Sequence, residues 1–406
     1  MYTFLWPLIA LLLSLLLSYF TIPFLKTLAL KHNIVDKPKK DRFHSNPTPL
    51  LGGMGIFWSF LLSLVVIGKV SILIVFAVLI GVSVVLIGIL KNSNHLPKIA
   101  IGGVIWSCIF PLFFVGDSDL RLVGMLLGGT VLLVMGSLDD TSKWILPHTK
   151  LLAQIAAAVF VIAFRIRIGF LGDPIWSIPL TLFWIIGVTN AFNLIDNMNG
   201  LSSGTAIIAS LFFGSIALYK AQAFSSSIDF YNSQMIIVLL CFALTGSCLG
   251  FFLHNFPKAK IFMGDGGSHF LGFTLASVAI IASWHTVSHV TSISVPIFVL
   301  CYPIFDITLV IFARIKERRP IYVGGTDHSS HRLVKMGCSP VDAVLLLLFL
   351  SFLGGFCALF LTMVEYKQGI MMIAFMLLIL VLFGIRMIKV NVGAPNIRKG
   401  RKNEGN

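Results

Sequence analysis

Four aspartates at the ends of apolar segments are the residues of this chain that could do chemistry. Asp139 and Asp140 close the run LLVMGSLDD, Asp196 lies in NAFNLIDNMNGL, and Asp265 lies in IFMGDGGS. The chain has only 16 Asp and Glu among 406 residues, and 57% of it is hydrophobic. A carboxylate at a membrane boundary is costly to desolvate, so its presence there indicates a function. Clustered acidic oxygens suit Mg²⁺, which usually contacts phosphate as well. The sequence therefore predicts a membrane enzyme that handles phosphates.

The spacing of the polar side chains predicts how they would be presented. On a helix, Asp139 and Asp140 would point about 100° apart, so one could face a metal or a nucleophile while the other hydrogen-bonds locally. A plain acidic helix end is the alternative, and it would oppose the helix dipole. Asn190, Asn193 and Asp196 recur every three residues and would share one helix face, as hard-oxygen ligands could. An Asn-rich turn before the next helix is the alternative there.

Three further segments carry groups suited to anions. Glycines on both sides of Asp265 let backbone N–H groups approach a phosphate, although the chain has no P-loop motif. The loop IKERRPIYVGGTDHSSHRLVKMG contains His328, His331 and Arg332 within a dense set of donors that suits a diphosphate or a lipid phosphate. A solvated basic loop would explain its arginines but not its histidines. The loop that contains His44 is basic, Pro-rich and ends in a Gly-Gly pair.

The elements that position these residues are apolar helices. A span needs roughly 20 apolar residues, and backbone groups in lipid must be satisfied internally, so long apolar runs without period-2 alternation predict helices. We expect an all-α, polytopic membrane bundle of about 11–13 transmembrane helices. It would form one catalytic domain over residues 1–390, and the basic tail 391–406 would be disordered. The expected segments are 3–24, 52–68, 70–90, 99–115, 122–138, 151–168, 174–190, 203–219, 235–253, 267–285, 290–313, 341–364 and 369–389.

The lysines and arginines predict the orientation of these segments. Threading them alternately places 24 of the 30 Lys and Arg residues on one side, which the positive-inside rule assigns to the cytoplasm. The four aspartates and both histidines of the DHSSHR segment fall on that same side. This convergence predicts one composite active site at the cytoplasmic face. The net charge of +14 suits anionic lipid and a polyanionic substrate. No basic stripe interleaves with aromatic residues, which argues against nucleic acid.

Taken together, these segments resemble the polyprenyl-phosphate N-acetylhexosamine-1-phosphate transferase family. That family includes bacterial enzymes that load GlcNAc-1-phosphate onto undecaprenyl phosphate, and the MurNAc-pentapeptide transferase. The matching pieces, in family order over about 300 residues, are the Pro-rich segment 36–53, LDD at 138–140, NAFNLID at 190–196, FMGDGGS at 262–268 and DHSSHRL at 327–333.

The resemblance implies a Mg²⁺-dependent transferase, with Mn²⁺ as the other candidate ion. It would pass N-acetylhexosamine-1-phosphate from a UDP-sugar to a polyprenyl phosphate, release UMP and start cell-envelope polysaccharide synthesis. The substrates would be UDP-N-acetylhexosamine and undecaprenyl phosphate, in the bacterial inner membrane, and a homodimer is left open. We assign the catalytic, metal and substrate-binding roles as follows: catalysis to Asp139, Asp140 and Asp196, the metal to Asp265 and Asn193, and substrate binding to Asn190, His328, His331, Arg332 and His44.

Three departures from the family pattern matter. The family usually has a second aspartate where this chain has Asn199, and Asn197 replaces a glycine. The DHSSHRL segment lacks the triple histidine of MurNAc-pentapeptide enzymes, which favours the GlcNAc branch. About two additional apolar segments lie between Gly53 and Asp139. The alternatives are therefore a secondary transporter that uses carboxylates such as Asp306, a MurNAc-pentapeptide phosphotransferase, and a catalytically weakened family member.

Overall fold

The computed structural model describes most of the chain. The described residues are 2–38, 46–66, 71–91, 93, 95–114, 120–141, 146–169, 172–223, 227–282, 289–320 and 325–390. His44 and the tail 391–406, for which the sequence predicts a substrate contact and disorder, lie outside this part of the chain.

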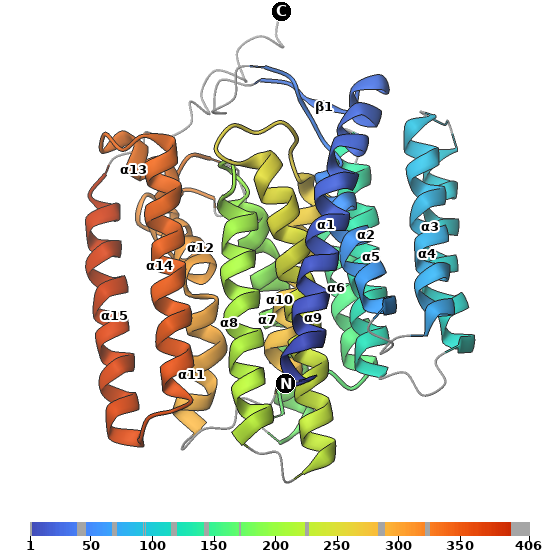
Figure 1. The fold of residues 1–406 in the computed structure, drawn as a ribbon. Coiled ribbons are helices and arrows are strands. Elements are labelled where there is room, and N and C mark those ends of the chain that lie inside the picture. The colour runs from blue at the N-terminus through green and yellow to red at the C-terminus, as the bar shows by residue number, and fades with distance from the viewer. Residues whose placement is uncertain are drawn as a thin grey trace, which may run out of the picture.

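The described chain is almost entirely helical (Figure 1). The helices are α1 Tyr2–Lys31, α2 Gly52–Val66, α3 Ile72–Leu90, α4 Leu96–Ile109, α5 Leu120–Thr141, α6 Pro147–Ala163, α7 Pro174–Ile195, α8 Leu201–Ala223, α9 Ile228–Asn255, α10 Gly264–Ile281, α11 His289–Val299, α12 Cys301–Lys316, α13 Ser329–Lys335, α14 Pro340–Leu361 and α15 Tyr366–Ile388. A 3₁₀ turn, Phe110–Phe114, follows α4, and the strands β1 Val35–Asp36 and β2 Thr48–Pro49 form a short antiparallel ribbon. The predicted all-α class is confirmed.

The helices are those of a multi-pass membrane protein. Among the described residues, eight helices are long and apolar enough to cross a membrane, and the bent pair α11–α12 makes a ninth if it is one span. Three shorter apolar helices, in α2, α4 and α6, fall below that length. Every predicted apolar segment contains a helix, but the segment 290–313 is broken near Leu300, where α11 and α12 meet at 82°. The lower number of full-length spans comes from the three short helices and from α10, whose polar first turns keep it out of that set.

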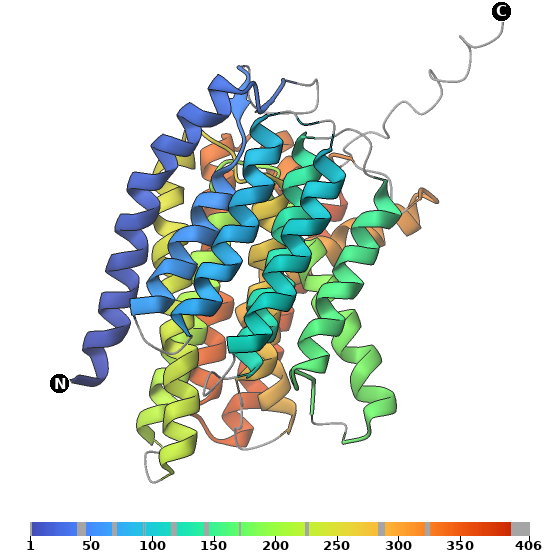
Figure 2. The same cartoon turned by 90° about the vertical axis from the view of Figure 1, so that its right-hand side faces the viewer.

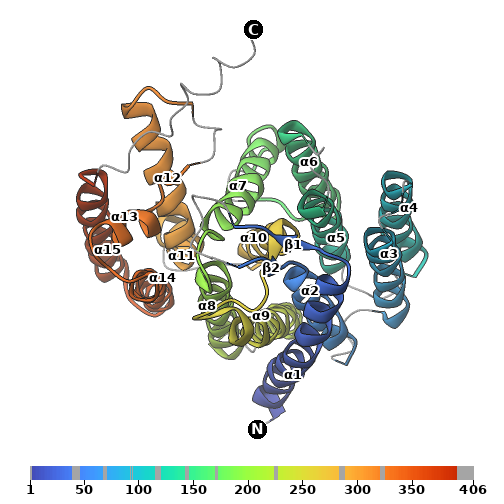
Figure 3. The same cartoon turned by 90° about the horizontal axis from the view of Figure 1, so that it is seen from above.

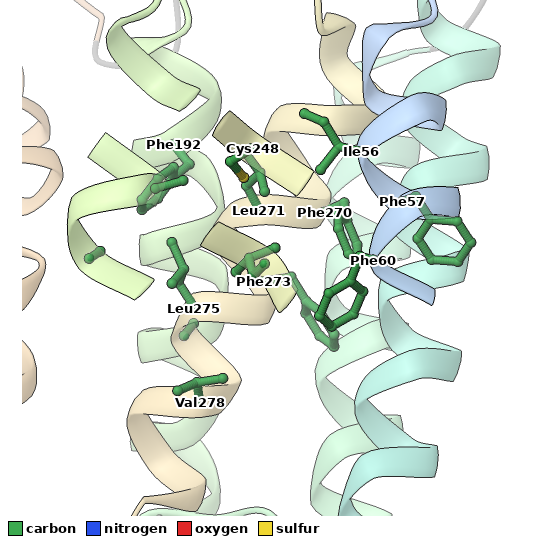
Figure 4. Packing of buried hydrophobic residues seen from close by; sticks show 14 of the residues in the cluster. Ile56, Phe57, Phe60, Phe192, Cys248, Phe270, Leu271, Phe273, Leu275 and Val278 are labelled. Carbon is green, nitrogen blue, oxygen red and sulfur yellow. The ribbon is translucent and has the colours of Figure 1, made fainter. Parts of the chain in front are cut away.

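Helix α10 occupies the middle of the bundle. It packs against α5, α7, α2 and α8, and the view from above shows these helices arranged around it (Figure 3). Its phenylalanine rings interlock with those of its neighbours, because Phe270 lies edge-on to Phe57 with ring centroids 5.1 Å apart (Figure 4). In lipid, packing rather than escape from water drives helix association, so such interlocking fixes the position of α10.

Glycines let α10 approach its neighbours closely at its N-terminal end. A Cβ added to Gly136 of α5 would lie 2.3 Å from the backbone nitrogen of Gly266, and one added to Gly53 of α2 would lie 2.4 Å from Cα of Gly267. Real Cβ atoms do not come this close, so only glycine fits at both positions. Small residues at such crossings are typical of membrane helices. As a result, the ends of α5 and α2 are held directly against the first turn of α10.

Two groups of helices flank this central part. Helices α3 and α4 form a hairpin at one edge, with α11 to α15 at the other (Figures 1 and 3), and Figure 2 is viewed from the side of the hairpin. The hairpin packs mainly on itself, since a Cβ on Gly81 would lie 2.6 Å from the carbonyl oxygen of Gly103. It corresponds to the two additional segments that the sequence predicts between Gly53 and Asp139. Because the chain returns to the side it left, α5 still ends at the same end of the bundle as α1.

Candidate active site

The two adjacent aspartates at the end of α5 have different partners. Asp139 forms an ion pair with Lys150 Nζ, at the start of α6. Asp140 Oδ1 instead accepts the backbone N–H of Asp265 at 3.0 Å, and its Oδ2 is 3.5 Å from the N–H of Gly266. Asp140 therefore supplies acceptors to the unpaired N–H groups at the start of α10, as an N-cap does. The expected divergence of neighbouring carboxylates on one helix explains why one faces Lys150 and the other holds α10.

Asp265, in the first turn of α10, shares a cation with Asp139. Lys150 Nζ lies 2.7 Å from Asp265 Oδ2 while it also contacts Asp139. The other oxygen, Oδ1, accepts from Asn193 Nδ2 at 3.1 Å, and the same amide nitrogen donates to Ser268 Oγ at 3.0 Å. Three separate stretches of chain thus converge on one carboxylate. The side chains of Asp139 and Asp265 keep 19% and 30% of their surface exposed, so solvent and a ligand can reach them.

Sequence reasoning missed Lys150 and His269, which complete this cluster. Lys150 lies in the first turn of α6, and α6 packs back against α5, so a basic residue early in the segment after the acidic pair is returned to it. His269 follows Asp265 by one turn, and its Nδ1 lies 2.6 Å from the carbonyl oxygen of Asp265. Lys150 and His269 also line a cavity of about 10 Å³, enough for roughly one water molecule. The basic loop after Asp140 was the signal for Lys150.

The asparagines of α7 are less free than the sequence suggests. Asn190 forms two reciprocal hydrogen bonds with Gln154 of α6, at 2.9 and 3.1 Å, so its predicted substrate contact competes with a structural pair. Asn193 presents its amide nitrogen to Asp265, so in this arrangement it orients that carboxylate, and a ligand role for its oxygen stays a prediction. Asp196 is the C-cap residue of α7, and its backbone N–H donates to Asn193. Its catalytic role also stays a prediction.

Asn199 takes part in the loop that joins α7 to α8. Its amide nitrogen donates to the carbonyl oxygen of Pro257 at 3.1 Å. Gly200 follows with φ of +76°, a backbone conformation that favours glycine, and its N–H donates to Asn255 Oδ1 at 2.6 Å. The position that departs from the family pattern is thus used to tie this loop to the segment before α10.

The β1–β2 ribbon and the start of α2 contact the segment that precedes Asp265. Pro49 of β2 accepts the N–H of Phe262 at 2.8 Å, and the N–H groups of Gly52 and Gly53 donate to the carbonyls of Phe262 and Met263 at 3.0 and 2.9 Å. These bonds fix the two residues that precede Gly264 and Asp265. The Gly-Gly pair of the Pro-rich segment therefore positions the acidic loop through its backbone.

The DHSSHR segment forms the start of the short helix α13 and is held at nearly every residue. Asp327 accepts from Arg314 at 3.1 Å and from Arg319 at 2.5 Å. Burial opposes ionisation of Asp327, but the hydrogen bonds from these two arginines outweigh it and hold its pKa below the usual range. Ser330 Oγ donates to Asn197 Oδ1 at 2.8 Å, which links the segment to the end of α7 and so to the acidic cluster.

Arg332 is held by backbone carbonyl groups in this structure, and its predicted substrate contact stays a prediction. Its side chain is only 1% exposed and donates to the carbonyl oxygens of Asp327, Met387 and Val390. These bonds anchor α13 to the end of α15, so the arginine acts in packing in this structure. His328 is also buried and contacts Asp306, whereas His331 lies one turn away with ring centroids 6.2 Å apart.

The acidic cluster is suited to a cation bound by few protein ligands. Among the described residues, no three His, Cys, Asp or Glu side chains are grouped so that they could hold a metal ion. Asp139 and Asp265 nevertheless direct one oxygen each at the same ammonium group of Lys150. Mg²⁺ is usually bound by one or two carboxylates together with water and substrate phosphates. The donor set therefore fits Mg²⁺ in the presence of a phosphate substrate better than it fits a metal site made of protein alone.

Comparison with known proteins gives a consistent result. Residues 122–283 match the model of glycosyl transferase family 4. The chain is 28% identical to a probable undecaprenyl-phosphate N-acetylglucosaminyl 1-phosphate transferase of Bacillus subtilis, over 92% of this chain and 89% of that protein. It is 31% identical to a decaprenyl-phosphate N-acetylglucosaminephosphotransferase of Mycobacterium leprae, over 49% of this chain and 54% of that protein. A phospho-N-acetylmuramoyl-pentapeptide-transferase of Listeria innocua is 38% identical, over 32% of this chain and 41% of that protein.

Proposed function

We propose, from the similarity of residues 122–283 to the model of glycosyl transferase family 4 and from its relatives, that the chain transfers GlcNAc-1-phosphate from UDP-GlcNAc to a polyprenyl phosphate. The observation that carries the proposal is the meeting of Asp139, Asp265 and Lys150 at the end of a membrane bundle. Two carboxylates and an ammonium group at a water boundary suit phosphoryl transfer, in which positioning and charge neutralisation account for most of the catalysis. The Bacillus subtilis relative, matched over most of both chains, supports the choice of substrates.

In the proposed reaction, an oxygen of the lipid phosphate attacks the β-phosphorus of the UDP-sugar. A new P–O bond forms while the bond from that phosphorus to the bridging oxygen breaks. UMP leaves with the bridging oxygen and its electron pair, and the product is a lipid-linked sugar diphosphate. We assign Asp139 to the orientation of the lipid phosphate, beside the cation that it would share with Asp265, because Asp140 is engaged with α10.

We propose Mg²⁺ as the cofactor, held by Asp265 and Asp139 with Asn193 orienting Asp265. Bound Mg²⁺ would neutralise charge on the diphosphate. Lys150, released from the two carboxylates, would donate to a phosphate oxygen. His328 and His331 remain the proposed substrate contacts of the DHSSHR segment, and its bond from Ser330 to Asn197 supports their approach to the cluster.

The proposed location is the inner membrane of a bacterium, with the site at the cytoplasmic face. The excess of Lys and Arg on the side that holds Asp139 and Asp265 supports this orientation. UDP-sugars are made in the cytoplasm, so the site would face its soluble substrate, while the polyprenyl phosphate would arrive from the bilayer. A homodimer stays a prediction, which light scattering of the purified protein would test.

One assay tests this function directly. Purified protein in lipid nanodiscs would be given undecaprenyl phosphate, Mg²⁺ and, separately, UDP-GlcNAc, UDP-GalNAc, UDP-glucose or UDP-MurNAc-pentapeptide. We expect UMP and lipid-linked GlcNAc with the first donor and none after the metal is removed with EDTA. Product from UDP-MurNAc-pentapeptide alone would move the chain to the other branch of the family. Turnover restored only by Asn199→Asp would identify a weakened enzyme, and no UMP from any donor would refute the proposal.

Substitution of Asp139 should lower the rate, whereas substitution of Asp140 should lower the stability. Asp139→Asn should lower kcat by about 10²-fold, with little change in melting temperature, because it removes a charge from the reacting groups. Asp140→Ala should instead lower the free energy of unfolding by about 1 to 2 kcal/mol, because the start of α10 loses its acceptor. UMP release and thermal melting of both purified variants would measure this. Equal losses of stability in the two variants would contradict the assignment.

A further inference from the structure

Asp306, in the middle of α12, holds the DHSSHR segment from inside the bundle. Its side chain is fully buried, and Oδ2 lies 2.8 Å from Nδ1 of His328. The other oxygen, Oδ1, accepts both the backbone N–H and the hydroxyl of Ser329, at 2.8 and 2.6 Å. A buried carboxylate is expensive unless it is paired and fully hydrogen-bonded, and here each oxygen has a partner. Asp306, an acid deep inside the apolar segment 290–313, is thus explained by its contact with the histidine segment.

The contact fixes which nitrogen of His328 carries a proton. An ionised carboxylate can only accept hydrogen bonds, so Nδ1 must be the donor. The tautomer of a histidine is set in this way by the partner of one ring nitrogen, which leaves the other nitrogen for chemistry. Among the described residues, no hydrogen bond to Nε2 of His328 accompanies the one at Nδ1. Asp306 therefore orients the ring and leaves Nε2 as the nitrogen that can contact a substrate.

A purely structural role would not require a carboxylate at this position. Asparagine has nearly the same shape, and its oxygen could accept both bonds from Ser329. Its NH₂ group would then face Nδ1 of His328 and force that nitrogen to be the acceptor, with the proton on Nε2. The backbone of the segment has other supports, because Asp327 is held by two arginines and Ser330 by Asn197. The feature that depends on the charge of Asp306 is the state of His328.

We infer that Asp306 is a positioning residue that acts through His328, by presenting the lone pair of Nε2 to an O–H group of a bound substrate, such as the protonated phosphate of the lipid. The inference rests on the proposed transfer reaction. It assigns a task to an acid that would otherwise suggest a proton-coupled transporter. A ring already fixed in this tautomer costs no reorganisation when it accepts the hydrogen bond or the proton of that O–H group, and a preorganised acceptor lowers the barrier in this way.

A double-mutant cycle tests the coupling. Asp306→Asn, His328→Gln and the double variant would be compared with the wild type for kcat, for KM of both substrates and for melting temperature. We expect kcat to fall about tenfold in Asp306→Asn and more in His328→Gln, with the double variant within about twofold of His328→Gln. Residues that act as a unit are non-additive in this way. Asp306→Glu should restore part of the rate. Losses that multiply in the double variant would overturn the inference.

Ser329→Ala provides the matched control. It removes one bond to Oδ1 of Asp306 and leaves the contact with His328, so its effect should multiply with that of His328→Gln. Non-additivity in this control as well would mean that any disturbance of the segment mimics loss of His328, and the inference would fail.

A spectroscopic measurement separates this inference from the proposed function. Nitrogen-15 signals of labelled histidine distinguish a proton on Nδ1 from one on Nε2, and His328→Gln assigns the signal. We expect the Nδ1–H form in the wild type and its loss in Asp306→Asn, whether or not any UDP-sugar is turned over. An unchanged tautomer in Asp306→Asn would refute the positioning role. Absence of transfer by a wild type that has the expected tautomer would refute only the proposed function.

Discussion

Asp265→Asn should abolish GlcNAc-1-phosphate transfer, with a loss of kcat of at least about 10³-fold. Asp265, at the start of α10, contacts Lys150 of α6 and Asn193 of α7, so three helices meet at its carboxylate. Asparagine keeps the shape of the side chain but removes the charge that a divalent cation or the Lys150 ammonium requires. Loss of one preorganised electrostatic contact costs about 10²- to 10³-fold, and loss of the cation that neutralises the diphosphate adds to it.

The measurement is UMP release over a range of Mg²⁺ concentrations, with melting temperature as a check on folding. Asp229→Asn is the matched control, because Asp229 is an exposed residue in the first turn of α9, at the other end of the bundle from Asp265. The control should keep the wild-type rate. If Asp265→Asn kept more than about a tenth of the wild-type rate at saturating Mg²⁺, Asp265 would have no part in the reaction.

Lys150→Met should have the second largest effect, because it removes the cation that two carboxylates share. Asp139 and Asp265 would then face each other without compensation. As a general scale, like charges about 4 Å apart repel by roughly 4 kcal/mol at the effective dielectric of a protein surface. Partial exposure of both side chains reduces this, so we expect the free energy of unfolding to fall by about 2 kcal/mol. Turnover should fall by about 10³-fold, because a donor to the phosphates is lost as well.

The same variant should become stabilised by divalent cations. Two unpaired carboxylates make a better Mg²⁺ site than two that hold a lysine, and a ligand at 100 times its Kd adds about 2.7 kcal/mol to folding stability. Melting curves with and without Mg²⁺, and without any substrate, would show this as a larger rise in Tm for Lys150→Met than for the wild type. Lys91→Met, at the exposed C-cap of α3, is the control and should match the wild type. An identical Mg²⁺ response in all three proteins would argue against a cation site between Asp139 and Asp265.

The sequence was sufficient to predict that Asp139, Asp140 and Asp265 would meet, because topology alone brings them to one side, whereas the place of Asp196 in the same site stays a prediction. Asp139, Asn193 and Asp265 each lie at the end of an apolar helix, and alternate threading places those ends together. What it could not predict is the pairing inside the cluster. Lys150 and Lys143 both follow the acidic pair in the sequence, and only the packing of α6 against α5 selects Lys150. The partners of Asn190 and Arg332 depend on side-chain contacts between helices, for which periodicity carries no signal.

Two prolines in the sequence indicate the break in the segment 290–313, which hydropathy does not reveal. Pro296 lies inside α11, and Pro303 follows the break at Leu300. Proline removes a backbone donor and clashes with the carbonyl four residues earlier, which for Pro303 is that of Val299. Hydropathy alone predicts one straight span here. The bend places α12 so that Asp306 can meet His328, and this contact was not predictable from either residue's own neighbourhood.

The hairpin of α3 and α4 has a consequence for how this architecture can change over evolutionary time. The two helices pack mainly on each other at the rim of the bundle, and the chain enters and leaves them on the same side. An ancestor could therefore acquire or discard such a pair without inverting anything downstream. A single additional helix would place Asp139 and Asp265 on the opposite side of the membrane. Length variation at this point of the chain should accordingly occur in even numbers of crossings.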